Sequence, residues 1–317
     1  MTDRRPPALF LMGPTAAGKT ELALALAERL PVGLISVDSA MVYRGLDIGT
    51  AKPDAATRAR VPHRLIDILD PAERYSAARF RDDALREMAA IWDSGRLPLL
   101  VGGTLLYFRA LAEGLSPLPE ADPQLRARLD AERQRLGSAA LHARLARIDP
   151  TAAARIHPND PQRIQRALEV HALTGQPLSR LQERQPEPFP YRVIRVIVAP
   201  AQRATLHARI EQRFERMLAQ GFVEEVAGLR ARGDLDPTLP ALRTVGYRQV
   251  WRYLAGETNR ATMRQEVLSA TRQLAKRQLT WLRPMHDALW VERPDAASVD
   301  ALVNGLRHNE VFASRSG

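Results

Sequence analysis

The segment Gly13–Thr20, which reads GPTAAGKT, constrains the fold of this chain more than any other feature. It follows the apolar run Ala8–Met12 and precedes a helix-forming stretch that begins at Glu21. A strand, a Gly-rich turn and a helix in this order are the structural context of a P-loop, whose backbone N–H groups hold phosphate oxygens. Lys19 would add a positive charge to the phosphates, and the Thr20 hydroxyl would bind Mg²⁺. We therefore expect a site for a di- or triphosphate, and not a merely structural turn, at Gly13, Pro14, Thr15, Ala16, Ala17, Gly18, Lys19 and Thr20.

The acidic strand end that most P-loop NTPases use to order Mg²⁺ is absent from the best candidate strand. The apolar run Leu97–Val101 ends in Gly102-Gly103-Thr104, which offers open backbone and one hydroxyl but no negative charge. Asp38, after the run Gly33–Val37, is the only acid at a strand end near the loop. The site is thus equipped to hold a pyrophosphate but poorly equipped to activate water, so we do not expect hydrolysis.

Composition narrows the class of protein. The chain has no cysteine, which excludes disulfides, thiolate zinc sites and cysteine nucleophiles. No apolar run approaches the roughly 18 residues of a membrane helix. The segment Met1–Pro7 has no apolar secretion signal and leads directly into the first strand. We expect a cytoplasmic protein without a membrane partner, in which one large domain carries a smaller one.

The net charge of +10 suggests a polyanionic partner such as nucleic acid. A genomic base composition that inflates arginine is the alternative explanation. Only three of the 46 basic residues are lysines, namely Lys19, Lys52 and Lys276. Because Arg and Lys are not interchangeable, the retained lysines point to positions where an ammonium group is needed.

The order of the predicted elements indicates an α/β fold, with a P-loop parallel-sheet core and an inserted small all-helical domain. Strands and helices alternate to about Leu115, and a proline-marked break at 114–119 follows. A helix-forming, Arg- and Ala-rich stretch then extends to a second Pro-rich break at 185–190, after which Arg192–Val198 has the pattern of a strand. We predict the core over 1–117 and 191–317, with helices at 205–220, 223–232 and 262–282, and the helical domain over 118–190.

Further motifs resemble those of the tRNA dimethylallyltransferases, P-loop enzymes also called IPP transferases. The resemblance extends from about residue 8 to residue 285 in the order of the family. It rests on Ser36–Arg44, Ile48–Pro53, Val101–Thr104 with Tyr107, Asn159–Arg163, Arg166–Val170, Val245–Gln249, Thr271–Gln278 and Thr280–Arg283. Members outside bacteria often add a C-terminal zinc finger, so this cysteine-free chain resembles the bacterial form.

The resemblance implies transfer of a dimethylallyl group from dimethylallyl diphosphate to N6 of the adenine 3′ to the anticodon, in tRNAs that read codons starting with U. The P-loop, with Lys19 and a Mg²⁺ ion on Thr20, would stabilise the departing pyrophosphate, where charge develops. Arg213 resembles a further pyrophosphate contact. Asp38 would be the general base for the amine proton, and Thr104 would place a hydroxyl near the adenine or the allyl group. On the residues alone, Asp38 is alternatively an N-cap or a Mg²⁺ ligand, Thr104 a turn residue and Arg213 a surface charge.

The implied partner is tRNA, bound through its anticodon stem-loop by a monomeric enzyme. The target adenine lies in a structured loop, so it would be flipped into a channel of the protein. The residues that the resemblance assigns to tRNA contact are Asp38, Ser39, Ala40, Met41, Thr104, Arg126, Gln162, Arg163, Ile164, Gln165, Arg166, Arg243, Thr244, Val245, Gly246, Tyr247, Arg248, Lys276, Arg277 and Arg283. Lys52 is expected at the mouth of the active site, with no assigned role.

The segment 276–283 alternates basic and aromatic residues, which suits phosphate contacts beside a stacking platform. The alternative is a solvated amphipathic helix with Trp281 in the core. Leu274, Leu279 and Leu282 do form an apolar stripe along it.

Two other functions stay open at this point. A P-loop small-molecule kinase that uses ATP would account for Gly13–Thr20, but it predicts neither an Arg-rich insertion nor dependence on RNA. A prenyltransferase acting on free adenine nucleotides, as cytokinin-making enzymes do, would share the core but lack most of the tRNA-facing motifs.

Overall fold

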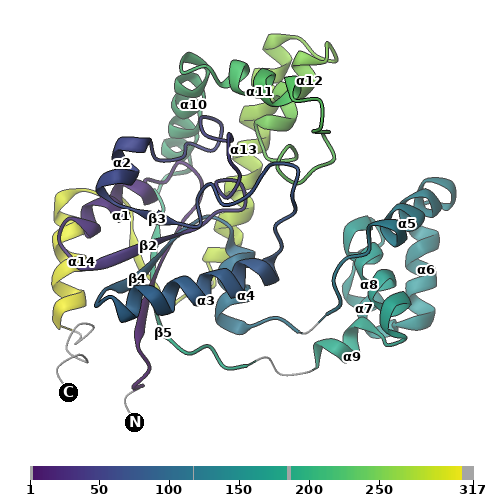
Figure 1. The fold of residues 1–317 in the computed structure, drawn as a ribbon, viewed down its shortest axis with the longest axis horizontal. Coiled ribbons are helices and arrows are strands. Elements are labelled where there is room, and N and C mark those ends of the chain that lie inside the picture. The colour runs from purple at the N-terminus through teal and green to yellow at the C-terminus, as the bar shows by residue number, and fades with distance from the viewer. Residues whose placement is uncertain (1–2, 117, 184–186, 309–317) are drawn as a thin grey trace. The chain divides into compact units, whose positions relative to one another are not determined.

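The structure is a computed structural model, and it describes residues 3–116, 118–183 and 187–308. The chain divides into two compact units (Figure 1): residues 1–112 with 189–317, and residues 113–188. The domain boundary that we placed between 117 and 118 falls at residue 117, which lies outside the described residues, as do residues 184–186 of the second Pro-rich break. The helical unit thus interrupts the unit that contains the P-loop.

The first unit is built on a parallel sheet of six strands, which confirms the predicted α/β class. The strand order is β3-β2-β4-β1-β5-β6. The strands are β1 (Pro7–Met12), β2 (Val32–Val37), β3 (His63–Arg64), β4 (Leu97–Gly102), β5 (Arg192–Val198) and β6 (Leu289–Val291). The edge strands β3 and β6 were not predicted, because two- and three-residue strands carry too short a pattern to stand out from a loop.

Strand β1 is buried on both faces, as its continuous apolar sequence requires. Phe10 and Met12 pack into one core with α3 (Ala77–Asp93) and α4 (Leu105–Glu113). Leu9 and Leu11 pack into another core with α1 (Lys19–Ala27) and α14 (Ala296–His308). Helices therefore cover both faces of the sheet (Figure 1).

A further group of helices forms a third core above the carboxyl ends of the strands (Figure 1). Its members are α10 (Arg203–Ala219), α11 (Phe222–Ala231), α12 (Tyr247–Leu254) and α13 (Arg260–Leu282), whereas α2 (Ala55–Arg60) has no buried residue and does not contribute to it. The three long helices predicted in this region are confirmed to within two residues at each end, whereas α12 was not predicted. Among the described residues, no helix is both long and apolar enough to cross a membrane.

The helical unit consists of short helices that start where the sequence places its Asp-Pro pairs and turns. They are α5 (Pro123–Leu136), α6 (Ser138–Ile148), α7 (Pro150–Arg155), α8 (Pro161–Thr174) and α9 (Leu178–Gln182). Asp122, Asp149 and Asp160 each accept an N–H bond from the first turn of the helix that follows. Proline at the first helical position lacks only an N–H that has no partner in the helix, so these starts are well defined by the sequence.

The sheet brings together residues that are far apart in the chain. Strands β1, β2 and β4 are parallel neighbours, and Met12 and Val37 both pair with Gly102. The segments that follow these strands therefore meet at one edge, where open α/β sheets bind ligands. Gly13 leaves β1 beside the end of β5, and a Cβ there would lie 2.3 Å from the carbonyl oxygen of Val198. Only glycine fits at the start of this loop.

Candidate active site

A cavity of about 1490 Å³ opens at the carboxyl edge of the sheet. The P-loop, the segment 38–41, the loop 47–55 and the turn 101–106 line it, together with side chains of α10 and α13. The predicted site residues that line it are Thr15, Ala16, Ala17, Gly18, Lys19, Thr20, Asp38, Ser39, Ala40, Met41, Thr104, Arg213, Arg243, Thr244, Val245, Gly246 and Arg277. Residues from two strand ends, the P-loop and the C-terminal helices thus share one space.

The P-loop wraps tightly before α1 begins at Lys19. Ala16 and Gly18 have φ angles of 62° and 100°, both in the left-handed region. The Lys19 ammonium donates to the carbonyl oxygens of Gly13 at 3.0 Å and Pro14 at 2.8 Å. Desolvation, with a smaller contribution from the charge of Arg213, lowers the pKa of Lys19 to about 8. An anionic oxygen in the loop would be a stronger partner for this ammonium than the two carbonyls.

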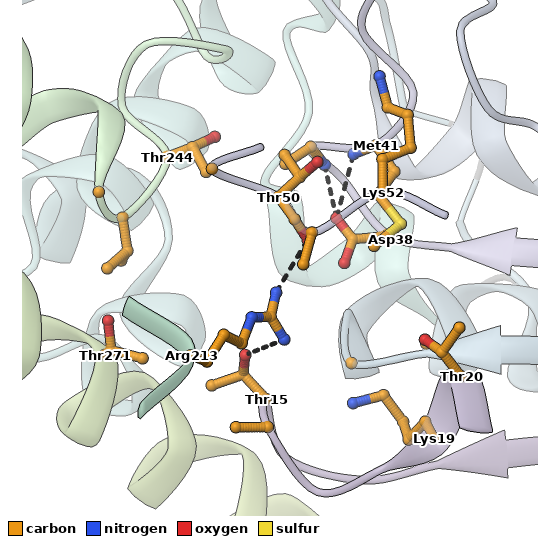
Figure 2. Close-up of a pocket in the computed structure, with 18 of the residues that line it drawn as sticks. Thr15, Lys19, Thr20, Asp38, Met41, Thr50, Lys52, Arg213, Thr244 and Thr271 are labelled. Atoms are coloured by element: carbon orange, nitrogen blue, oxygen red, sulfur yellow. Dashed lines mark hydrogen bonds between the residues drawn. The ribbon is translucent and has the colours of Figure 1, made fainter. Parts of the chain in front are cut away.

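Two arginines of α10 reach the P-loop. Arg213 donates to the Thr15 hydroxyl at 3.5 Å and to the carbonyl oxygen of Thr50 at 2.9 Å, so its guanidinium bridges two walls of the cavity (Figure 2). Burial lowers the pKa of Arg213 from its usual value. Arg209 donates to the carbonyl oxygen of Ala17 at 3.2 Å. Arg209 was not predicted as a site residue, and Arg213 was predicted only from the family resemblance.

Asp38 follows β2 and faces the same cavity as Lys19 and Arg213 (Figure 2). Its Oδ1 accepts N–H bonds from Ala40 at 2.8 Å and Met41 at 3.3 Å, so the carboxylate caps the turn that follows the strand. Within the described part of the chain, Oδ2 accepts no hydrogen bond. One oxygen therefore caps a turn, and not the helix that the N-cap alternative requires, and the other oxygen is available to a ligand.

Thr104 ties the end of β4 to the turn beside Asp38. Its backbone N–H donates to the carbonyl oxygen of Val37 at 3.2 Å, and its hydroxyl accepts the N–H of Ser39 at 3.1 Å. The neutral strand end therefore places a hydroxyl at the backbone of Ser39, the residue after Asp38.

The oxygen ligands beside the P-loop fit a Mg²⁺ ion that would take most of its ligands from the substrate and from water. Thr20 lies exposed in the first turn of α1, beside Lys19. Among the described residues there is no cluster of three or more His, Cys, Asp or Glu side chains that could enclose a metal. Mg²⁺ keeps several waters and usually takes only one or two protein oxygens along with phosphate oxygens, which Thr20 and a diphosphate would supply.

Lys52 contributes to the cavity wall, but its ammonium is engaged within the protein. It donates to the carbonyl oxygen of Tyr43 at 2.9 Å, to Asp47 at 2.5 Å and to Asp67 at 2.6 Å, and its side chain is only 1% exposed. Burial raises the pKa of Asp67, but the hydrogen bonds from Lys52 and Arg58 outweigh burial and leave it lowered. Lys52 thus holds the segment 43–52 in place.

Glu225 on α11, which was not among the predicted site residues, also holds this segment. Its carboxylate accepts the N–H groups of Asp47, Ile48 and Gly49 at 2.7–3.1 Å and the Tyr247 hydroxyl at 2.5 Å. Tyr247 has no exposed surface. Its assignment to tRNA contact is therefore wrong for the side chain, because the ring packs in the core and the hydroxyl binds Glu225.

The predicted basic segment lies at the C-terminal end of α13, where some side chains are exposed and others are buried. Lys276, Arg277 and Arg283 are exposed, but only Arg277 lines the cavity. Trp281 lines it too and is 40% exposed, with the Arg109 guanidinium 6.0 Å from its ring centroid. The alternative that placed Trp281 in the core is therefore wrong, although Leu282 of the apolar stripe is fully buried.

The same helix supplies Gln278, a second residue that we missed. Its side-chain amide accepts from the Thr15 N–H at 2.9 Å and donates to the carbonyl oxygen of Gly103 at 2.8 Å. A sequence signal did exist: Gln278 lies four residues from both Leu274 and Leu282, so a polar amide occupies the apolar stripe.

Of the segment 243–248, Arg243 through Gly246 line the cavity, whereas Arg248 is exposed but does not line it. The predicted contacts in the helical unit are less uniform. Gln162 and Arg163 are exposed on α8. Ile164 has no exposed surface and packs in the core of that unit, so its assignment to tRNA contact is wrong for the side chain.

Arg126 and Arg166 instead make an internal ion cluster. Both donate to Glu169, which has no exposed surface, at 2.8–3.0 Å from Arg126 and 2.6 Å from Arg166. Gln165 donates to the carbonyl oxygen of Arg126 at 3.0 Å. These charges therefore join α5 to α8 and are only partly presented to solvent.

Comparison with known proteins gives the family of the chain. The model of the IPP transferase family matches residues 41–285. The chain belongs to this family. Among curated IPP transferase relatives, the tRNA dimethylallyltransferase of Thioalkalivibrio sulfidiphilus is 60% identical over 98% of this chain and 97% of its own length. That of Alkalilimnicola ehrlichii is 64% identical over 88% of each chain, and that of Nitrosococcus oceani is 61% identical over 98% and 99%.

Solved structures agree with this membership of the IPP transferases. The tRNA isopentenylpyrophosphate transferase of Bacillus halodurans superposes with a TM-score of 0.71, at 36% identity and 98% coverage of both chains. A eukaryotic dimethylallyltransferase acting on tRNA, at 23% identity, shares the fold with a TM-score of 0.79 over 98% of this chain and 80% of that one. The resemblance seen in the sequence motifs is thereby confirmed.

Proposed function

We propose that the protein transfers the dimethylallyl group of dimethylallyl diphosphate to N6 of the adenine 3′ to the anticodon in tRNAs that read codons starting with U. The activity rests on the names of the curated relatives, which are tRNA dimethylallyltransferases at 60–64% identity. The chemistry rests on one observation: Lys19, Arg213 and Asp38 face a common cavity.

The P-loop side of the cavity would hold the diphosphate. Lys19 and Arg213 would neutralise the charge that develops on the leaving oxygen as the bond from the allylic carbon breaks. Thr20, with the diphosphate oxygens, would hold Mg²⁺, which when bound supplies further positive charge to the leaving group.

The Asp38 side would hold the adenine. N6 attacks the allylic carbon, a C–N bond forms, the C–O bond breaks, and pyrophosphate leaves. The proton of N6 passes to Asp38 Oδ2, which is the carboxylate oxygen not used for capping the turn. Thr104 would place its hydroxyl beside the adenine, in keeping with its position next to Ser39. The two halves of the cavity then present the reactants in line.

The adenine of a structured anticodon loop would reach this site only when it is flipped out of the loop. The cavity of about 1490 Å³ has room for a base together with an isoprenoid diphosphate. Arg243 and Arg277, which line it, and Gln162 and Arg163 on α8 would contact the RNA backbone. We propose that one chain suffices for the reaction.

Labelled substrates test the proposal. The protein is incubated with Mg²⁺ and labelled dimethylallyl diphosphate and with either unmodified tRNA or AMP, and in parallel with labelled ATP and small acceptors. We expect label in tRNAs that carry three consecutive adenines, and none in AMP. Label in AMP would favour a prenyltransferase for free nucleotides, and phosphoryl transfer from ATP would favour a kinase.

A further inference from the structure

Gln278 joins the two sides of the cavity through one side-chain amide. Its Oε1 accepts the Thr15 N–H at 2.9 Å, and its Nε2 donates to the carbonyl oxygen of Gly103 at 2.8 Å. The side chain is buried, with 9% exposed. Because one partner is a donor and the other an acceptor, the amide has a single satisfactory orientation.

The two partners of Gln278 belong to different halves of the reaction. Thr15 lies in the P-loop, and its hydroxyl accepts a hydrogen bond from the Arg213 guanidinium (Figure 2). Gly103 immediately precedes Thr104, whose hydroxyl binds the N–H of Ser39 beside Asp38. A rigid amide therefore spans from the side that would hold the diphosphate to the side that would hold the adenine.

The contact is close and depends on glycine. A Cβ at Gly103 would lie 2.4 Å from Nε2 of Gln278, so no other residue would let the amide reach this carbonyl without a shift. Burying a side-chain amide is unfavourable unless its hydrogen bonds are made, and both are made here. A leucine would otherwise suit this stripe of α13, between Leu274 and Leu282.

We propose that Gln278 is a positioning residue that sets the distance between the departing diphosphate and the attacking N6. The inference rests on the proposed function. It acts through Thr15 on the Arg213 side and through Gly103 on the Asp38 side, and it need not touch either substrate. Gln278 lies on the same helix one residue after Arg277 and three before Trp281, and both of these side chains line the cavity.

The first test replaces Gln278 by methionine, which has a similar length but makes neither hydrogen bond. We expect kcat to fall by about 10- to 100-fold, because small misplacements of reacting groups have effects of this size. The KM for tRNA should change by less than about threefold. Gln273→Met on the exposed face of the same helix is the matched control and should leave both constants unchanged.

The second test, Gln278→Glu, separates positioning from simple packing. An ionised carboxylate still accepts from Thr15 but cannot donate to Gly103, whereas the protonated acid can do both. The ratio of kcat for Gln278→Glu to kcat for the wild-type enzyme should therefore rise as pH falls from 8 to 5.5. The corresponding ratio for Gln278→Met should stay flat.

All assays use folded protein, checked by circular dichroism at the assay temperature. A wild-type kcat in Gln278→Met, a loss that matches the unfolded fraction, or a flat pH ratio in Gln278→Glu would each overturn the positioning role. Transfer by the wild-type enzyme is measured alongside. Its absence would overturn the proposed function itself, whereas normal transfer by both wild type and Gln278→Met would overturn only the positioning role.

Discussion

The Tyr247 hydroxyl donates a 2.5 Å hydrogen bond to Glu225, and the same carboxylate accepts three backbone N–H groups of the segment 47–49. The next residue of that segment, Thr50, gives its carbonyl oxygen to Arg213. The hydrogen bond between Tyr247 on α12 and Glu225 on α11 is thus connected to the guanidinium beside the P-loop. Burial and the charge of Glu225 raise the pKa of Tyr247, so its hydroxyl stays a donor over the whole physiological range.

Tyr247→Phe removes this hydroxyl and keeps the ring in the core. We expect the free energy of unfolding to fall by about 1–3 kcal/mol, because the half-buried Glu225 carboxylate loses one of its donors. Urea denaturation measures the change. Tyr253→Phe, on the same helix and without a hydrogen bond from its hydroxyl among the described residues, serves as control. Equal stability of Tyr247→Phe and wild type would show that the bond contributes nothing.

Asp38 can be tested separately for its two roles. Asn at this position still accepts the N–H groups of Ala40 and Met41 but cannot take a proton from N6. We expect Asp38→Asn to lower the rate of prenyl transfer by about 10²–10⁴-fold with tRNA affinity little changed. Asp38→Ala should lose as much activity and also loosen the turn. Rates under saturating substrates and filter-binding of tRNA give the two quantities, and intact turnover with weakened binding would contradict the role as base.

Lys19 makes diphosphate binding sensitive to alkaline pH. The protonated ammonium binds the diphosphate, and its pKa in the free protein is about 8. Above that pH the group must take up a proton on binding, so affinity should fall by up to about tenfold per pH unit. Lys19→Arg stays charged in this range.

The measurement is the Kd of inorganic pyrophosphate with Mg²⁺ from pH 6.5 to 9.5, by calorimetry. The ratio of wild-type Kd to Lys19→Arg Kd cancels the titration of the ligand and should be constant below pH 7.5 and rise above 8. A ratio that is flat across the range would place the pKa of Lys19 elsewhere.

Two arginines three residues apart on α8 should respond differently to neutralisation. Arg163 is exposed and pairs only with Asp160 within the described residues, so Arg163→Gln should leave stability unchanged and reduce the slope of log affinity for tRNA against log salt by about 1. Arg166 binds the buried Glu169, so Arg166→Gln should lower the free energy of unfolding by about 1–3 kcal/mol.

Titrations of tRNA between 50 and 200 mM salt and urea denaturation distinguish these outcomes. An unchanged salt slope in Arg163→Gln would exclude this side chain from phosphate contact. Equal stability of Arg166→Gln and wild type would mean that Arg126 alone satisfies the carboxylate.

The sequence by itself determined the elements whose signals are local. The P-loop follows from eight adjacent residues between a strand and a helix, and β5 was predicted with its observed bounds because β-branched residues occupy five of its seven positions. In the helical unit, Asp-Pro pairs and glycines marked the helix ends, since capping depends on residues one to three positions apart.

The tertiary structure decided the partners of the polar side chains. Gln278 binds residues 263 and 175 positions away, and Glu225 binds a segment 176–178 positions away. No local pattern specifies such pairs, because they depend on which helix packs over which strand end. For the same reason Tyr247 and Ile164, which the family resemblance assigns to tRNA contact, have side chains that lie in cores. A motif marks a segment, but packing decides which of its side chains face a ligand.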